Sequence, residues 1–274
     1  MPFSTNYRLK IPNIAINRIC CHPKGEKGYS FIGYPKMMKT LLYEGKAKRI
    51  YQTNEANVVL VEYKDSATAF NGEKKAEITG KGRLNNEITS ILFEELSGKG
   101  IESHFIKKIS TTEQLVKRLT IIPLEVVVRN VVAGSLAKRL GIEEGTPLSK
   151  PIVEYYLKND ELGDPLVTVD HILELDVANL EELEILKMKA LEINTVLSGI
   201  FTNMGVRLID FKLEFGKDHS GRIILADEVS PDTCRLWDTK TNEKLDKDVF
   251  RRELGSLTET YEKILARLGG AING

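Results

Sequence analysis

The chain lacks the features of a membrane protein, a disulfide-rich secreted protein or a strongly charged nucleic-acid-binding protein. No run of about 18 apolar residues occurs, so no segment is suited to cross a bilayer. The 274 residues include only three cysteines, too few for a disulfide framework, which favours a reducing compartment such as the cytoplasm. Lysine plus arginine equals aspartate plus glutamate at 39 each, so no bulk charge favours nucleic acid or an anionic membrane as a partner.

Motifs for zinc binding and for nucleophilic catalysis are also scarce. The four histidines share no pattern that would support a Ser/His/Asp triad. Cys20, Cys21 and His22 resemble a fragment of a metal site, but no second Cys/His cluster completes the tetrahedral ligand set that zinc needs. Neither the P-loop spacing nor G-x-G-x-x-G occurs.

Residues 1–37 differ in composition from the rest of the chain. They carry six basic residues against a single acid, Glu26, and four prolines that break any long helix. They could be a disordered extension, a targeting peptide, or the product of a start assigned upstream of Met37 or Met38. The first and third readings are favoured, because no apolar segment of the signal-peptide type is present.

The remaining residues predict a β-rich lobe over 38–120. Short β-type runs between residues 40 and 63 are broken at Gly45 and Asn54. An amphipathic helix over 84–96 follows, and Gly98 ends it. The run "SHFIKKI" predicts a further strand, and "TTEQLVKRL" predicts a short helix. This lobe is expected to be a mainly antiparallel sheet with one or two covering helices.

Residues 121–274 predict an α/β lobe. A nearly continuous β-branched run at 121–131 indicates a buried strand, and a short helix begins at Gly134. Residues 150–175 show no regular pattern, and a long helix is expected over 179–204. A hairpin of strands at 207–215 and 222–228 comes next. One last helix is expected from about Asp246, because apolar residues recur at helical spacing from Phe250 to Leu268.

The segment "LIDFKLEFG" (208–216) carries the most informative charge pattern. On a strand, Asp210, Lys212 and Glu214 share one face about 7 Å apart. The hairpin register adds Asp227 to this face, or Glu228 if it shifts by one residue. Carboxylates packed together repel one another, and Mg²⁺ removes the conflict because it binds one or two carboxylates plus phosphates. The alternative is a solvated charged face.

Other segments have residue types suited to phosphate binding. Arg129 lies in the β-branched run and needs a partner if buried. Ser135 is at a helix start, where free N–H groups bind phosphate, although serine is also a routine N-cap. Arg235 could clamp a phosphate or pair with Asp232 or Asp238 at the surface. The parts together indicate ATP-driven chemistry.

Three segments in one colinear order resemble signature segments of the SAICAR synthetase family: "IIPLEVVVRNVVAGS", "LIDFKLEFG" and "DEVSPDTCRLWD". The resemblance runs from about Lys39 to Gly269, and residues 1–37 have no counterpart. It implies a two-lobed α+β fold related to ATP-grasp, with an ATP-binding N-terminal lobe, a C-terminal lobe for substrate and metal, and the site in the cleft between them.

The resemblance also implies a reaction. As a carbon–nitrogen ligase of de novo purine synthesis, the protein would join L-aspartate to the carboxylate of CAIR (carboxyaminoimidazole ribonucleotide). The products would be SAICAR, ADP and phosphate, formed through an acyl phosphate. Mg²⁺ as cofactor, ATP as co-substrate, a cytoplasmic location and a homodimer without nucleic-acid or membrane partners are implied too.

Site residues follow from the resemblance position by position. Lys212 and Asp210 would be catalytic, with Lys212 neutralising the transferring phosphate. The metal ligands would be Glu214 and Asp227, while a role for Glu228 stays open. ATP would be bound by Lys46, Lys48, Glu125, Val127 and Glu214. The substrate would be bound by Arg129, Ser135, Lys158, Arg235 and Arg251.

Two positions depart from the family pattern. Some members have Asp where this chain has Asn71, and others have His where it has Gly163, so the residues that bind L-aspartate are left unassigned. Two other classes remain open: a different ATP-dependent carboxylate–amine ligase, which would change the acceptor, and a catalytically silent nucleotide-binding protein. The presence of both metal carboxylates and Lys212 argues against the silent protein.

Overall fold

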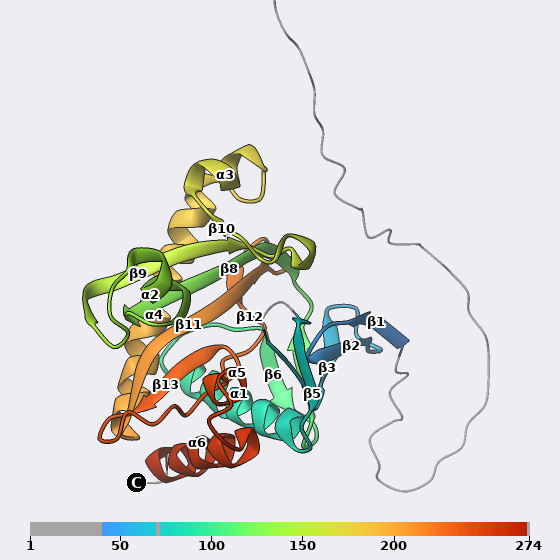
Figure 1. The fold of residues 1–274 in the computed structure, drawn as a ribbon. Helices are drawn as coiled ribbons and strands as arrows, with labels where there is room; N and C mark the ends of the chain where they lie inside the picture. Colours follow the sequence, from blue (N-terminus) through green and yellow to red (C-terminus); the bar gives the residue numbers. More distant parts are fainter. Residues whose placement is uncertain (1–39, 70–71, 273–274) are drawn as a thin grey trace, which may run out of the picture. The chain divides into compact units, whose positions relative to one another are not determined.

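The first of two large sheets lies in the N-terminal part of the described chain. The computed structural model describes residues 40–69 and 72–272, which lie in one compact unit. A five-stranded antiparallel sheet has the order β1 (Thr40–Glu44), β2 (Lys48–Gln52), β3 (Val58–Tyr63), β7 (Glu113–Lys117), β6 (Phe105–Lys108). The hairpin β4 (Ser66–Ala69) and β5 (Lys74–Glu77) and helix α1 (Lys81–Gly98) connect β3 to β6 (Figure 1).

A six-stranded antiparallel sheet follows. Its order is β10 (Leu166–Val167), β9 (Pro147–Leu157), β8 (Thr120–Val131), β11 (Val206–Lys217), β12 (Ile223–Ala226). The sixth strand, β13 (Cys234–Asp238), pairs with the first half of β11, whereas β12 pairs with the second half. Strand β11 therefore contacts three other strands and is central to this sheet.

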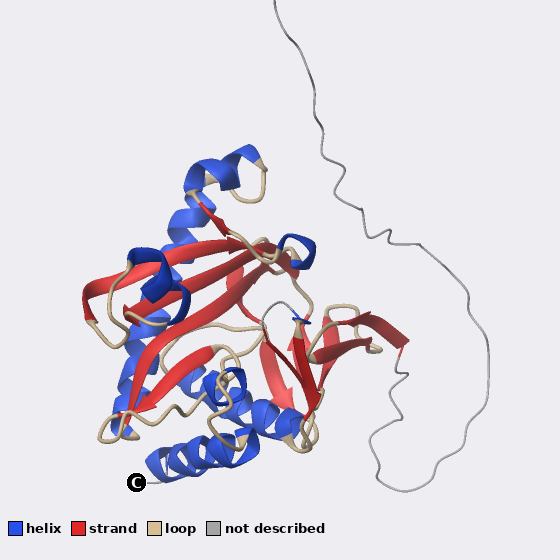
Figure 2. Cartoon of the chain, viewed as in Figure 1, coloured by secondary structure: helices blue, strands red, loops and turns tan. Residues whose placement is uncertain are grey.

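Helices surround the two sheets. The C-terminal half contains α2 (Gly134–Leu140), the 3-10 turn η2 (Asp160–Leu162), α3 (Val169–Glu174), α4 (Leu180–Asn203), α5 (Asp248–Arg251) and α6 (Leu257–Ile272). Helix α4 begins at a capping box in which Asn179 and Glu182 each accept a hydrogen bond from the other's backbone N–H. Figure 2 shows α4 extending along the six-stranded sheet. No helix of the described ranges is long and apolar enough to cross a membrane.

The main hydrophobic core joins both halves of the described chain. Alternation along β8 and β11 sends Val126, Val128, Phe211 and Leu213 to one face, where they are fully buried or nearly so. The same cluster includes buried apolar residues of α1, α4 and α6. The opposite face of β8 and β11 is thereby left to the charged residues of these strands.

Several predicted elements are confirmed. The long helix expected over 179–204 is α4, the short helix expected at Gly134 is α2, and the hairpin strands are β11 and β12. The amphipathic helix near 84–96 is α1, and the strand expected at "SHFIKKI" is β6. The mixed architecture with antiparallel sheets agrees with the predicted α+β fold class.

Two predictions for segments between α1 and α4 are wrong. The segment "TTEQLVKRL" contains strand β7 instead of a helix, because Gln114 and Val116 alternate inward between β3 and β6. Residues 150–175 are not irregular, since they hold most of β9, β10 and α3. Pro147 and Pro151 are tolerated in β9 because β10 covers only the end near Tyr155 and Tyr156, so the proline half lies at a sheet edge.

The prediction of a single C-terminal helix is also wrong. The chain forms α5 and α6, and the segment between them breaks the helix. Glu253 and Gly255 there adopt φ values of 57° and 149°, which a right-handed helix does not contain. Leu254 is consequently 57% exposed, although its spacing matches the apolar stripe.

Candidate active site

The polar face of the six-stranded sheet gathers most of the predicted site residues. Cross-strand register sets Asp210 opposite Arg129, Lys212 opposite Val127 and Glu214 opposite Glu125. The next strands add Glu154 and Tyr156 from β9 and Arg235 from β13. Because directly opposed residues point to the same side of a sheet, these side chains form one surface.

A cluster of lysines and carboxylates occupies one end of this surface. The lysine–carboxylate cluster comprises Lys48, Lys158, Lys212, Glu125, Glu214, Asp227 and Glu228. The Lys212 Nζ lies 2.6 Å from a Glu214 oxygen, 3.2 Å from Glu125 and 3.5 Å from Asp227. Lys158 pairs with the second oxygen of Glu214. Glu214 and Glu125 can therefore lie opposite each other, because an ammonium lies between them.

Both acids left open by the hairpin register belong to this cluster. Glu214 is opposite Ala226, where β12 ends, and Asp227 then adopts a φ of 58°. This left-handed residue ends the alternation, so Asp227 and Glu228 both reach Lys48 Nζ, at 2.6 Å and 2.8 Å. Of the two, Asp227 also contacts Lys212, while Glu228 accepts a hydrogen bond from Ser230 Oγ at 2.7 Å.

Burial and charge fix the ionisation of these groups. Burial opposes the charge on Lys48, but Asp227 and Glu228 outweigh it and raise the Lys48 pKa above its ordinary value. Burial likewise opposes the charge on Lys212, yet its carboxylate neighbours, Glu214 foremost, raise the pKa well above the usual range. Burial also disfavours ionised Asp227, but Lys48 and Lys212 lower the pKa of that carboxyl. Lys48, Lys212 and Asp227 therefore hold their charges within the cluster.

A second cluster surrounds Asp210. The arginine cluster comprises Arg129, Arg235 and Arg251 with Asp210, Glu154, Asp248, Ser135 and Tyr156. Asp210 is 3% exposed and accepts hydrogen bonds from Arg129 Nη1 at 2.9 Å and from Arg235 Nη1 at 2.9 Å and 3.1 Å. Asp210 therefore does not join Lys212 and Glu214, and the charged row predicted for β11 divides between two clusters.

Each arginine has further partners. Arg129, 3% exposed, donates to Glu154 at 2.6 Å, Tyr156 at 2.9 Å and Ser135 Oγ at 3.1 Å, which confirms that it has partners when buried. Arg235 pairs with Asp210 and Asp248. Arg235 does not form the alternative ion pair with Asp232 or Asp238 that was considered from the sequence.

A close backbone approach accompanies the arginine cluster. Gly134 has a φ of 53°, and a Cβ placed on it would lie 2.5 Å from Arg235 Nη2. Asp248 receives Arg235 Nε at 3.0 Å and Arg251 Nη1 at 2.6 Å, so α5 is joined to β13. The guanidinium groups are thereby fixed before any ligand binds.

The sequence profile of the SAICAR synthetase family matches residues 41–268. This chain belongs to the SAICAR synthetase family. It is 70% identical over 231 residues to the phosphoribosylaminoimidazole-succinocarboxamide synthase of Bacillus cytotoxicus, covering 84% of this chain and 97% of that relative. It is 67% identical over 230 residues to the synthase of Anoxybacillus flavithermus, with 84% and 96% covered. The family predicted from the three segments is therefore confirmed.

Solved structures agree. The crystal structure of the Ehrlichia chaffeensis phosphoribosylaminoimidazole-succinocarboxamide synthase has a TM-score of 0.82 at 50% identity, covering 84% of this chain and 98% of that one. A SAICAR synthetase solved in complex with ADP has a TM-score of 0.81 at 50% identity, with 83% and 97% covered. The predicted two-lobed α+β fold of the family is confirmed by these neighbours.

Other residues expected from the SAICAR synthetase resemblance have varied surroundings. Lys46 is exposed and pairs with Asp160 of η2 at 2.7 Å, so its partner differs from those of Lys48. Val127 lies on β8 opposite Lys212, and Lys158 lies within the lysine–carboxylate cluster. Asn71, the Cys20-Cys21-His22 segment and residues 1–37 lie outside the described residues.

Magnesium binding was expected at Glu214 and Asp227. In residues 40–69 and 72–272, no group of three or more His, Cys, Asp or Glu side chains is arranged to hold a metal ion. The two carboxylates nevertheless approach the same Lys212 nitrogen; Glu214 is buried and Asp227 is half-buried. A pair of carboxylates fits Mg²⁺, because this ion completes its octahedron with water and substrate phosphates.

Sequence reasoning missed a third group of buried charges in this family member. Asp232 forms ion pairs with Lys81 Nζ at 2.7 Å and Lys247 Nζ at 3.3 Å, and it accepts a hydrogen bond from the Tyr261 hydroxyl at 2.6 Å. Lys81 is only 1% exposed. Residues 230–232 are Ser-Pro-Asp, a turn-forming triplet that was a signal for Asp232, whereas nothing distinguished Lys81 from an ordinary lysine at a helix start. These contacts anchor the loop between Asp227 and Arg235.

His104 was missed as well. Its Nε2 lies 3.1 Å from the Asp227 backbone oxygen, and burial lowers the pKa of its imidazole to about 4.

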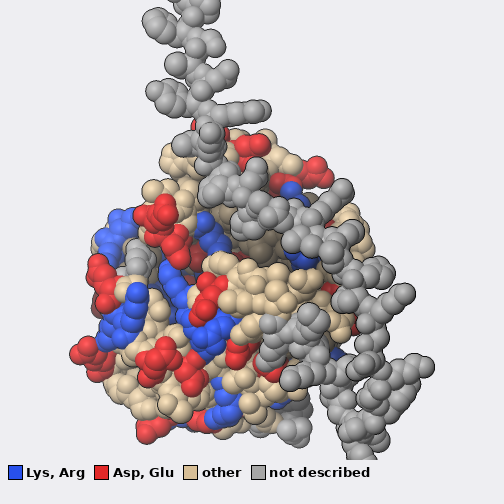
Figure 3. All heavy atoms as spheres, turned by 90° about the vertical axis from the view of Figure 1, so that its right-hand side faces the viewer, with Lys and Arg blue, Asp and Glu red and all other residues tan. Residues whose placement is uncertain are grey.

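The face in Figure 3 shows Lys and Arg side chains gathered toward the middle, with Asp and Glu side chains among and around them. The charge balance of the sequence thus corresponds to a mixed surface on this face, without a field of one sign.

Proposed function

We propose that this chain ligates L-aspartate to the carboxylate of CAIR with ATP, giving SAICAR, ADP and phosphate in de novo purine synthesis. Membership of the SAICAR synthetase family supports this reaction. The structural observation that carries it is that one strand, β11, contributes Lys212 and Glu214 to a lysine–carboxylate cluster and Asp210 to an adjoining arginine cluster. One cluster suits a nucleotide with its metal, and the other suits a phosphorylated substrate.

The lysine–carboxylate cluster would carry out phosphoryl transfer. Phosphoryl transfer depends on positioning and charge stabilisation, and needs no covalent protein group. Lys48 and Lys212 hold full positive charge next to the nucleotide end of the surface and would contact ATP phosphates. Lys212 would neutralise charge on the γ-phosphoryl group as it moves to a carboxylate oxygen of CAIR.

The acyl phosphate explains why ATP is consumed. A carboxylate is a poor electrophile because its leaving group would be an oxide ion, whereas the phosphorylated carboxyl can expel phosphate. The amine of aspartate would attack the acyl carbon. A C–N bond forms, the bond from the acyl carbon to the phosphate oxygen breaks, and the nitrogen loses a proton to give the amide.

The arginine cluster would bind CAIR. Arg129, Ser135 and Arg235 present guanidinium and hydroxyl groups suited to the ribonucleotide phosphate. Asp210, 3% exposed, would hold both arginines at a fixed separation rather than touch the transferring group. Arg251 would extend the cluster through Asp248.

Mg²⁺ would be held by Glu214 and Asp227. When bound, this ion supplies charge neutralisation for phosphate oxygens. Lys158 and Lys212 would keep the Glu214 carboxylate oriented for it.

The nucleotide side is supported by a relative. A SAICAR synthetase that shares 50% of its residues with this chain was solved in complex with ADP. In this chain, Glu125 and Val127 in the middle of β8 would border the adenine, and Lys46 would contact the phosphates from the turn before β2.

A homodimer in the cytoplasm is the expected state of the protein. Large apolar side chains are exposed close together in the chain, at Leu162, Leu166, Val169, Leu173 and Leu180. Exposed apolar groups of this kind are typical of a subunit interface. Light scattering of the purified chain would test this expectation, and a mass of one chain at micromolar concentration would contradict it.

The reaction is tested by product analysis. The purified chain is incubated with ATP, CAIR, Mg²⁺ and L-aspartate, and mass spectrometry follows SAICAR, with each substrate omitted in turn. SAICAR is expected only with all components present. Product formed with another amine in place of aspartate would favour the different carboxylate–amine ligase, and ATP binding without product would favour the silent protein.

A further inference from the structure

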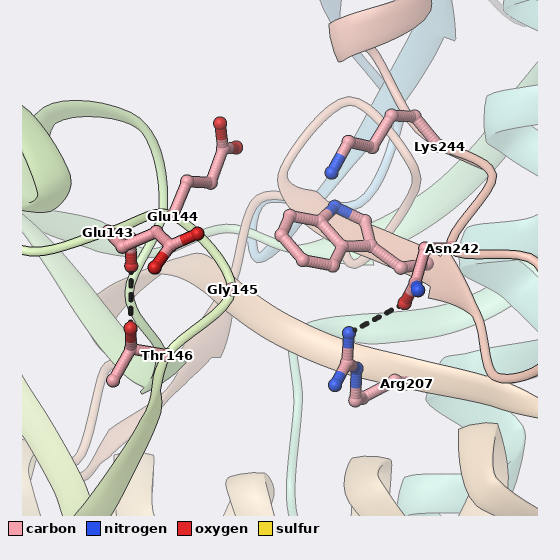
Figure 4. A pocket seen from close by; sticks show the side chains of 8 residues that line it. Glu143, Glu144, Gly145, Thr146, Arg207, Asn242 and Lys244 are labelled. Carbon is pink, nitrogen blue, oxygen red and sulfur yellow. Dashed lines mark hydrogen bonds between the residues drawn. The ribbon is translucent and has the colours of Figure 1, made fainter.

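A pocket unrelated to the predicted site residues lies beside the arginine cluster. It has a volume of ≈ 550 Å³ and is lined by Glu143, Glu144, Gly145, Thr146, Arg207, Trp237, Asn242 and Lys244 (Figure 4). Trp237 is two residues from Arg235 on β13, and Arg207 is opposite it on β11. The pocket therefore lies on the arginine-cluster face of the sheet, at the end of β11 away from Lys212 and Glu214.

Two buried N–H groups that line the pocket have no hydrogen-bond acceptor among the described residues. Trp237 is 3% exposed, and its indole Nε1 has no hydrogen-bond partner within the described ranges. The Arg207 Nε is also buried and has no hydrogen-bond acceptor among the described residues. The Nη2 of the same side chain donates to Asn242 Oδ1 at 3.0 Å (Figure 4). A buried donor left without an acceptor destabilises the folded protein until an acceptor reaches it.

Two cations contact the same indole ring. The Lys244 Nζ lies 3.0 Å from the centre of the Trp237 ring, and the Arg207 guanidinium carbon lies 5.3 Å from it. Lys244 forms no ion pair with any residue of the described chain. Burial lowers the pKa of this lysine, and the nearby carboxylates of Glu144, Asp246 and Asp248 oppose that shift without reversing it.

The acids of the pocket do not neutralise these cations. Glu144 is paired with Arg252, at 2.7 Å and 3.1 Å. Glu143 is exposed, and its backbone oxygen accepts a hydrogen bond from Thr146 Oγ1. The Glu143 carboxylate is therefore the one acidic group of the pocket lining that is not paired with an arginine. The Trp237 Nε1 and the Arg207 Nε therefore remain donors without an acceptor among the described residues, beside the Lys244 ammonium, which forms no ion pair there.

We propose that this pocket binds a small oxyanion, a phosphate or carboxylate group whose oxygens accept hydrogen bonds from Lys244 and from the indole N–H of Trp237. The site is separate from the ATP and CAIR sites, because it shares no side chain with the lysine–carboxylate cluster or the arginine cluster. The volume exceeds that of inorganic phosphate, so the group that binds can belong to a larger metabolite.

Trp237 is the single tryptophan of the chain, so its fluorescence reports on this pocket. Inorganic phosphate and succinate are titrated separately into the purified full chain, which distinguishes a phosphate from a carboxylate source. We expect a saturable change in emission with at least one of them. Lys244→Met should weaken binding at least tenfold while turnover stays unchanged, and Glu143→Gln should strengthen binding severalfold by removing a negative charge.

The Arg129→Lys variant separates this site from the CAIR site. It should lose CAIR affinity but keep the fluorescence response to the anion. The proposal is overturned if wild type gives no saturable response, if the response is lost in Arg129→Lys, or if neither Lys244→Met nor Glu143→Gln changes the affinity. Should Lys244→Met fail to fold in a thermal melt, the Glu143→Gln result decides alone, because stronger binding supports the proposal and unchanged binding contradicts it.

Discussion

Asp227 shows how one backbone angle determines the make-up of the site. Ideal alternation from Glu214 through Ala226 would bring only Glu228 to the face of Lys212. The φ of 58° at Asp227 turns the chain, so Asp227 contacts Lys212 and Lys48 while Glu228 stays on Lys48. Aspartate tolerates this region better than most residues do, so the position can carry a carboxylate with little strain.

Loss of either proposed metal ligand should impair chemistry without unfolding the protein. Glu214→Gln and Asp227→Asn are each expected to lower kcat more than tenfold, raising the barrier by at least about 1.4 kcal/mol. Asparagine also tolerates the left-handed backbone at residue 227. Steady-state kinetics at saturating Mg²⁺ measures the effect, with Glu94→Gln on the exposed face of α1 as the matched control. Full activity in either variant would remove the metal role.

His104 should make the protein sensitive to acid. Its pKa is about 4 when folded, against 6.5 for the free side chain, so the unfolded chain binds the proton first as the pH falls. Stability is therefore unaffected above pH 6.5 and is lost between 6.5 and about 4, by up to about 3 kcal/mol.

Urea unfolding of wild type and His104→Gln between pH 4 and 7 measures this contribution. Glutamine can still donate to the Asp227 backbone oxygen but does not titrate. The stability difference between the two proteins should shift in favour of the variant as the pH falls through that window. A difference that does not vary with pH would show that His104 is not held neutral by burial.

At the scale of elements, the short helix α2 and strand β13 meet at Gly134. A Cβ there would lie 2.5 Å from Arg235, and a φ of 53° disfavours any side chain. We expect Gly134→Ala to displace Arg235 and to raise the KM for CAIR about tenfold or more, with a smaller change in the KM for ATP. Gly141→Ala, also at positive φ but with open space around its Cβ, is the matched control. Equal effects of both variants on CAIR would contradict the role of the close approach.

The elements also show what sequence reasoning could and could not predict. Strands β8 and β11 were predictable because the β-branched run of β8 and the apolar–polar alternation of β11 both indicate a strand. β7 was missed because its apolar residues fit helical spacing as well, and only pairing with β3 and β6 decides. The break between α5 and α6 was missed because the spacing of apolar residues does not indicate the positive φ values at Glu253 and Gly255.

The candidate site was predicted in its residue types but not in its grouping. Sequence spacing put Asp210 with Lys212 and Glu214, whereas Arg129 and Arg235, distant in sequence, take Asp210 into another cluster. Lys46 and Lys48 looked equivalent, yet Lys46 lies in the turn before β2 and has a different partner. Long-range partners such as Lys81 for Asp232 leave no local signal.

At the scale of the whole molecule, α1 connects the two halves of the described chain. Its buried face includes Leu84, Ile88 and Leu92, which belong to the same core as β8, β11, α4 and α6. The smaller five-stranded sheet has a separate apolar cluster around Val59, Val61, Tyr63 and Val116. The division into lobes at residue 120 stays a prediction, since α1 precedes it in sequence but packs with elements that follow it.

Leu92→Ala should test this shared core. Leu92 is fully buried, so the change is expected to reduce the free energy of unfolding by about 2–5 kcal/mol. Because the helix joins both sheets, the Trp237 fluorescence and far-UV circular dichroism of the variant should move to lower denaturant with coincident midpoints. Separate midpoints would show that the two sheets unfold independently. Leu254→Ala, at an exposed leucine, is the matched control.

The central claim is that the two clusters on β11 activate the CAIR carboxylate with ATP for attack by aspartate. The most direct measurement is ADP release in a coupled assay with CAIR, with and without L-aspartate, for wild type and Lys212→Met. We predict sustained ADP release only when aspartate is present, and a loss of more than tenfold in the variant. ADP release that does not depend on aspartate, or that persists unchanged without Lys212, would contradict the account.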